Sequence, residues 1–115
     1  MITPAGREAL AGWVAESLAD PGRGDEFPAA LSFMFALGRD RVVGLLQARA
    51  AALAASLDAD ETALARAEAG GTPAVFLSEH RYQLALGRAE HTRLGTFTQA
   101  LRTGELRWPS PPGKD

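Results

Sequence analysis

The segment from Arg39 to Ala69 constrains the fold of this chain more than any other part of the sequence. It is rich in Ala and Leu, which lose little side-chain freedom in a helix. Gly38 precedes it, and the run Gly70-Gly71-Thr72-Pro73 is a strong stop. We therefore predict one long helix, with a kink or a second helix start left open at the acidic run 58–61. Apolar residues recur in two seven-residue series, Leu46 with Leu53, and Ala50 with Leu57 and Leu64.

Two shorter helical segments precede it. Thr3 can cap free backbone N–H groups and Pro4 suits the first helical position, so a helix starts here. Asp20-Pro21-Gly22-Arg23-Gly24 should end it in a short polar loop. The run Phe27 to Leu37 is apolar nearly all round and holds three of the five phenylalanines. That pattern predicts burial on more than one side, so we expect this run to be the centre of the core.

A second long helix is predicted from Ala74 to about Arg107. Gly87 and Gly95 interrupt it, and they either weaken the helix or mark close backbone contacts. The fold class is therefore all-α, with two short helices followed by two long antiparallel ones. We expect one domain over residues 1–108, and a flexible Pro-rich tail over residues 109–115.

Composition narrows the function classes. The chain has no cysteine, which excludes disulfides, cysteine-based zinc sites and a thiol nucleophile. We find no signal peptide and no apolar run of the ~20 residues that span a bilayer, so we expect a cytoplasmic protein without membrane contact. The net charge of -2 is unusual for a domain that binds nucleic acid by itself.

Two helices of about 30 residues extend ~45 Å each, which is long for a chain of this size. A monomer would struggle to cover both apolar stripes, so association with a second copy is the simplest way to bury them. We expect a homodimer whose interface consists of Leu46, Leu53, Leu57, Leu64, Leu84, Leu94, Phe97 and Leu101.

Four blocks of the sequence resemble, in order, the C-terminal domain of PadR-type transcriptional regulators, of the virulence activator alpha C-terminal kind. They are "ITPAGREALAGW", "FPAALSFMFALG", "RVVGLLQARAAALAASL" and "HTRLGTFTQALRTGELRW". The first resembles the segment where the family leaves its DNA-binding wing and enters the C-terminal helices. The Trp-Leu pair that the family often has near Phe97 is missing here.

The resemblance implies dimerisation, with sensing of a small hydrophobic effector. Some PadR-type regulators hold flat drugs between aromatic side chains, so Trp13, Phe33 and Phe97 are the ligand-binding candidates. Trp13 can equally be a core or interface anchor. The family's winged helix should precede residue 2, outside this chain. We therefore expect DNA binding only through that domain and not by these residues.

We identify no catalytic constellation and expect neither an enzyme nor a cofactor. His80 and His91 are eleven residues apart, ~16 Å along one helix, too far to share a metal ion within one chain. One enzymatic alternative is a small chorismate-mutase-type protein, in which Arg39, Arg41, Arg49 and Arg66 grip carboxylates. A further alternative is a stand-alone helical adaptor that forms mixed dimers with full-length regulators.

Overall fold

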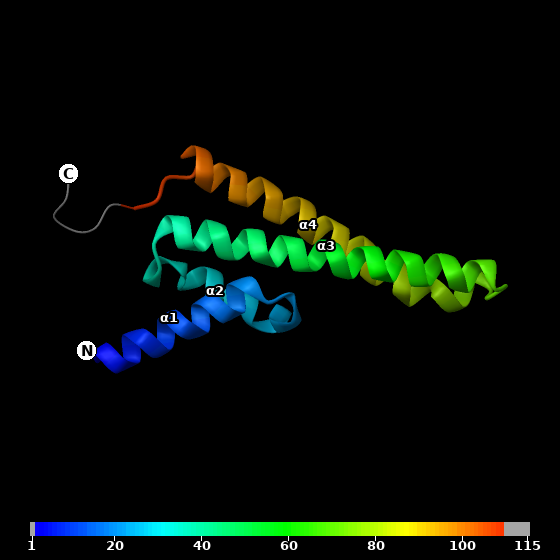
Figure 1. Cartoon of the computed structure of the whole chain (residues 1–115), viewed down its shortest axis with the longest axis horizontal. Coiled ribbons are helices and arrows are strands. Elements are labelled where there is room, and N and C mark those ends of the chain that lie inside the picture. The colour runs from blue at the N-terminus through cyan, green and yellow to red at the C-terminus, as the bar shows by residue number, and fades with distance from the viewer. Residues whose placement is uncertain (1, 110–115) are drawn as a thin grey trace.

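The computed structural model describes residues 2–109, and within them every regular element is helical. The all-α fold is confirmed, with two short α-helices before two long ones (Figure 1). The α-helices are α1 (Pro4–Ala19), α2 (Phe27–Ser32), α3 (Arg39–Ala69) and α4 (Ser78–Thr103), and the 3-10 turns are η1 (Pro21–Glu26), η2 (Met34–Ala36) and η3 (Ala74–Leu77).

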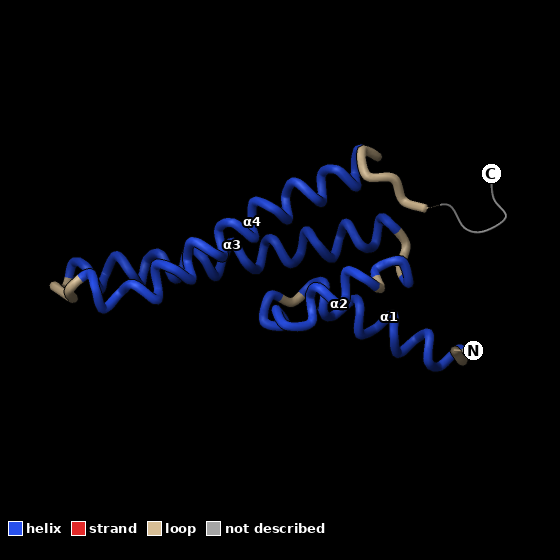
Figure 2. Tube along the Cα trace, turned by 180° about the vertical axis from the view of Figure 1, so that it is seen from behind, coloured by secondary structure: helices blue, strands red, loops and turns tan. Residues whose placement is uncertain are grey.

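The two long helices form an antiparallel hairpin that sets the shape of the molecule. In Figures 1 and 2, α3 runs between α4 on one side and α1 with α2 on the other, and the hairpin tip extends well beyond the short helices. The chain measures 64 × 31 × 17 Å, with a radius of gyration of 18.1 Å. A compact domain of this length has a radius of about 13 Å. Much of the hairpin is therefore covered by nothing else in the described chain.

Local signals at the start of α1 act as predicted. The Thr3 hydroxyl accepts a hydrogen bond from the Gly6 N–H at 3.0 Å, and Pro4 opens the helix. The expected loop after α1 is instead the 3-10 turn η1, because the Asp20 carboxylate accepts from the Gly22 N–H at 2.8 Å and so caps a further turn.

The Phe27–Leu37 run is not the centre of the core, contrary to our prediction. The helix breaks at Phe33, whose φ of -110° and ψ of 10° are not helical, and a 3-10 turn follows. This break turns Phe33 and Phe35 outward, leaving them 51% and 54% exposed. Phe33 packs edge-on against Trp13, and Phe35 packs against Trp108, with ring centroids 6.4 and 4.8 Å apart.

The long helices begin and end close to the predicted residues. α3 is continuous through the acidic run 58–61, so neither the kink nor the second start is present. Gly71 adopts a φ of 89° in the hairpin turn. α4 is shorter than predicted at both ends, because residues 74–77 form the 3-10 turn η3 and Gly104 ends the helix in the left-handed conformation at a φ of 83°. The predicted tail lies outside the described residues from position 110 onward.

A close approach between the long helices explains Gly87. A Cβ atom at this position would lie 2.5 Å from Cδ2 of Leu57, whereas a Cβ at Gly95 would meet nothing within 4 Å. Gly87 therefore allows α4 to pack closely on α3, and Gly95 marks no such contact.

The apolar core is divided into two unequal clusters. The larger lies where all four helices meet, at the end of the hairpin away from its tip, and the smaller consists of Leu64, Leu77 and Leu84 near the tip, with Leu57 and Ala67 against it. Fully buried side chains of the larger cluster are Val14, Leu18, Ala30, Val42 and Leu46.

By length and composition alone α3 could cross a membrane, which we did not expect from the sequence. From Val42 to Leu57 its only charged residue is Arg49. Core helices of soluble proteins pass the same test, although only 17% of the apolar window of α3 is buried in the single chain, where it packs against α1 and α4.

Candidate functional site

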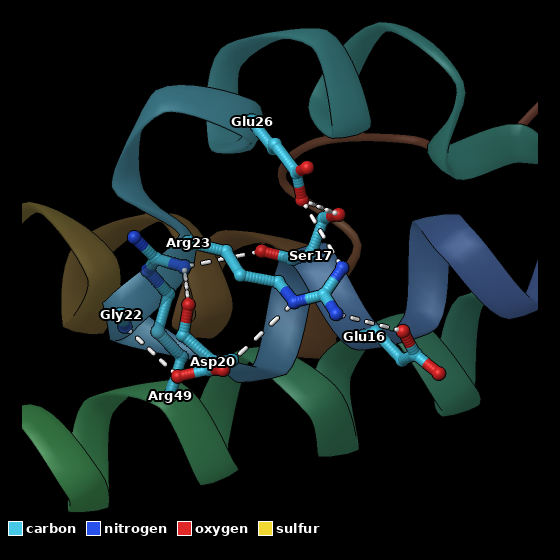
Figure 3. A network of polar contacts seen from close by, with 7 residues as sticks. All are labelled: Glu16, Ser17, Asp20, Gly22, Arg23, Glu26 and Arg49. Atoms are coloured by element: carbon cyan, nitrogen blue, oxygen red, sulfur yellow. Dashed lines mark hydrogen bonds and ion pairs between the residues drawn. The ribbon is translucent and has the colours of Figure 1, made fainter.

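Arg49 is the main polar centre of the fold. Its side chain is 1% exposed and lies on α3, facing the end of α1 (Figure 3). One terminal nitrogen donates to the backbone carbonyls of Ser17 and Asp20, at 3.1 and 3.0 Å. Nε donates to the Glu90 carboxylate on α4 at 3.3 Å. The guanidinium carbon lies 3.8 Å from the ring centroid of Phe27 on α2.

One side chain thus joins all four helices. The Ser17 carbonyl has no helical partner, because Pro21 four residues later has no N–H, and the carbonyls at this helix end carry partial negative charge, so a cation placed there satisfies both needs. Stacking on Phe27 covers the face of the guanidinium, and Glu90 balances its charge. Because these contacts join four helices through one buried side chain, we call Arg49 a structural joint.

A second, more exposed group of charges lies beside this joint. The Glu26 carboxylate accepts from the Ser17 hydroxyl at 2.9 Å and from Arg23 at 3.3 Å. Arg23 also pairs with Glu16 at 3.2 Å (Figure 3). These bonds close η1 onto α1 and so hold the connection between the short helices.

The hydrogen bond from Ser17, helped by the charge of Arg23, lowers the pKa of Glu26 from its ordinary value of 4.5. A carboxyl whose pKa is lowered on folding stabilises the fold at pH values above the pKa that it has in the unfolded chain. It loses that contribution as pH falls through the lowered pKa of the folded chain. We expect Ser17→Ala to raise the pKa of Glu26 toward 4.5, as followed by NMR titration of the carboxyl carbon. Ser32→Ala is the matched control, and equal titration curves in both variants would contradict the assignment.

The arginines of the enzymatic alternative do not converge within the chain. Arg39 is exposed and pairs with its neighbour Asp40, and Arg41 and Arg66 are exposed too. Arg49 lies between them along α3, ~15 Å from Arg39 and ~25 Å from Arg66 by helical rise. Neither of the two cavities described below is lined by any of these four side chains.

The three predicted ligand-binding aromatics are not assembled into one site. Trp13 and Phe33 contact each other, but Phe97 lies elsewhere, at a small hollow of about 190 Å³ between α2 and α4. One chain by itself therefore does not bring these three side chains together. The lining of the hollow is Phe27, Leu31, Arg93, Leu94 and Phe97.

The predicted dimer-interface leucines mostly lie inside the chain. Their seven-residue spacing does mark a helix contact, but it is the contact between α3 and α4 of the same hairpin. In this conformation the buried members of the set are not available to a second copy. The five that are buried are Leu46, Leu64, Leu84, Leu94 and Leu101, while Leu53, Leu57 and Phe97 are half-buried.

A different face of α4 carries the exposed apolar residues, and our sequence reasoning missed it. Tyr82 and Leu86 are 58% and 50% exposed. Together with Glu79, Ala89 and Arg93, all exposed, they recur at alternating spacings of three and four residues, which place them on one side of the helix. We call these five residues the α4 stripe. The same periodicity is present in the sequence and could have indicated this face. We instead assigned the dimer interface to the stronger leucine series of α4, which is buried in the structure.

Two further features lie near the hairpin tip. Val75 and Phe76 are each 72% exposed. A cavity of about 480 Å³ lies nearby between the long helices, and its lining includes Leu64, Ala67, Asp60, Glu79 and His80. Among the described residues no group of three His, Asp or Glu side chains could hold a metal ion.

Comparison with known proteins finds no relative of this chain. No protein-family model, no curated protein and no solved structure matches the chain.

Proposed function

We propose that this chain is the association domain of a PadR-type transcriptional regulator, and that in the cytoplasm it holds two copies of the regulator together. The observation that carries the proposal is the α4 stripe, a helix face with exposed apolar side chains that no other described element covers. The family assignment rests on the four ordered sequence blocks.

The shape of the chain supports association. A slender hairpin exposes more surface than a compact domain of the same length, and here the exposed part includes Tyr82, Leu86, Val75 and Phe76. Large apolar side chains gathered on one surface mark contact sites in soluble proteins. Tyr and Phe are also enriched in protein interfaces.

The polar contacts of Arg49 and Glu26 support the same interpretation, because they hold helices in place. Arg49 donates to the end of α1 and to Glu90, and Glu26 accepts from Ser17 and Arg23. The joint at Arg49 fixes the end of α1 to the hairpin. α1 is the helix to which the family resemblance attaches a DNA-reading domain. Arg49 would therefore set the direction of that domain relative to the association surface.

The proposal predicts a dimer in solution. At tens of micromolar, size-exclusion chromatography with light scattering should give twice the 12.1 kDa mass of one chain. Dilution should shift the mass toward a single chain, because one exposed helix face buries a moderate area. A folded species that keeps the single-chain mass across this concentration range would contradict the proposal.

A further inference from the structure

Building on the proposed self-association, we propose that two copies of the chain pair antiparallel through the α4 stripe, about a two-fold axis that passes beside Leu86. A two-fold interface uses the same patch on both copies, so the patch must be complementary to itself when it is reversed. The α4 stripe meets this condition in its charges, in its apolar centre and at its two ends.

The charges of the stripe are self-complementary. Glu79 lies seven residues before Leu86 and Arg93 seven residues after it. Antiparallel pairing about Leu86 therefore sets Glu79 opposite the partner's Arg93, twice per dimer. Parallel pairing would instead set Glu79 against the partner's Glu79, with like charges in contact.

The other charged residues on this part of α4 are already paired within the chain. Arg81 pairs with Glu68, Arg88 with Glu61, and Glu90 with Arg49. Among the described residues Glu79 and Arg93 have no ion-pair partner in their own chain. The two free ionised groups of this stretch are thus the two that antiparallel pairing brings together.

The centre of the stripe supplies the apolar contact. Leu86 on the axis meets the partner's Leu86, and Tyr82 covers it on either side. Both are about half exposed in the single chain and point away from the face of α4 that packs on α3. Aromatic and aliphatic side chains at the middle of an interface are the ones that contribute most to binding.

The ends of the interface explain two features that have no role within one chain. Phe76 lies in η3, just before α4 and ten residues before Leu86, so antiparallel pairing places it at about the level of position 96 of the partner, next to the partner's Phe97. The hollow of about 190 Å³ lies at that point. An exposed phenyl group on one copy thus faces an apolar hollow on the other, and the axis repeats the contact at the far end.

Charge reversal tests this register. Glu79→Arg should weaken the dimer, raising its dissociation constant on the order of tenfold, because two exposed ion pairs are replaced by two repulsive contacts. Arg93→Glu should do the same. The double variant Glu79→Arg/Arg93→Glu should return the dissociation constant to within about threefold of the original, since it restores both pairs in reversed order. Asp58→Arg, an exposed reversal on α3, is the control and should change nothing.

Cross-linking tests the axis. The chain has no cysteine, so Leu86→Cys introduces the only thiol. At the axis the two thiols meet and should form a disulfide on mild oxidation, which requires Cα atoms within about 7 Å. Thr96→Cys is the control, because ten residues from the axis its two copies lie about 30 Å apart along the helices.

The outcomes separate this inference from the proposed function. A wild-type chain that is monomeric throughout contradicts both. A dimer that resists both charge reversals, or that cross-links through Thr96→Cys and not Leu86→Cys, overturns the α4 pairing and leaves self-association standing. Weakening by each reversal, recovery in the double variant and cross-linking at position 86 support the pairing. All substituted positions are exposed, so circular dichroism should show unchanged helix content.

Discussion

Replacing Arg49 by methionine lowers the free energy of unfolding by about 3 kcal/mol or more. The substitution keeps most of the side-chain volume but removes every donor. The Ser17 carbonyl then loses its hydrogen bond at the end of α1, the Asp20 carbonyl keeps only its bond from the Arg23 N–H, and Glu90 loses its counter-ion. Among the described residues no other side chain is bonded to the Ser17 carbonyl or to Glu90, so the fold has no ready substitute.

Urea denaturation followed by circular dichroism measures this loss. Arg41→Met, an exposed arginine on the same helix, is the matched control and should change stability by less than about 0.5 kcal/mol. The free energy of unfolding of Arg49→Lys should lie between those of Arg49→Met and Arg41→Met. An ammonium group keeps the charge but cannot reach all the acceptors that the planar guanidinium reaches. Equal stabilities for Arg49→Met and Arg41→Met would show that the joint contributes nothing.

The second large effect is expected at Leu46. This side chain is completely buried in the larger core cluster, so Leu46→Ala should cost about 3 kcal/mol through lost apolar burial and the cavity left behind. From the sequence alone we predicted Leu46 at the dimer interface. A core position and an interface position predict a different dependence of this loss on protein concentration.

Truncating a core residue lowers the free energy of unfolding by the same amount at every protein concentration. Truncating an interface residue lowers it more at concentrations where the dimer is populated. We therefore expect the Leu46→Ala effect to be independent of concentration between about 1 and 100 µM. Leu86→Ala is the comparison, and its effect should be small in dilute samples and should grow with concentration. If the loss of stability in Leu46→Ala increased with protein concentration, Leu46 would belong to the dimer interface.

Local sequence signals predicted the elements well and their packing less well. The cap at Thr3 and the stop at Gly70 to Pro73 act through neighbouring residues, so they could be read directly. The burial of the Phe27–Leu37 run could not. A short run that is apolar on all sides fits a buried helix and also a helix broken at Phe33, and tertiary contacts decide between them.

The same limit applies to the candidate site. The bonding partners of Arg49 are 29, 32 and 41 residues away in the sequence, so no local spacing could indicate them. One signal was present, since Arg49 is the only charge between Val42 and Leu57. The leucine series correctly indicated a helix contact, but periodicity does not tell whether the partner helix belongs to the same chain.

The division of the core into two unequal clusters has a consequence for how the chain opens. The tip cluster of Leu64, Leu77 and Leu84 has few apolar contacts, so the tip should separate transiently while the four-helix end stays closed. The stripe on α4 spans both regions, from Glu79 near the tip to Arg93 beside α2. A partner bound along the stripe would contact both the hairpin tip and the four-helix end. The two regions would then unfold as a single cooperative unit.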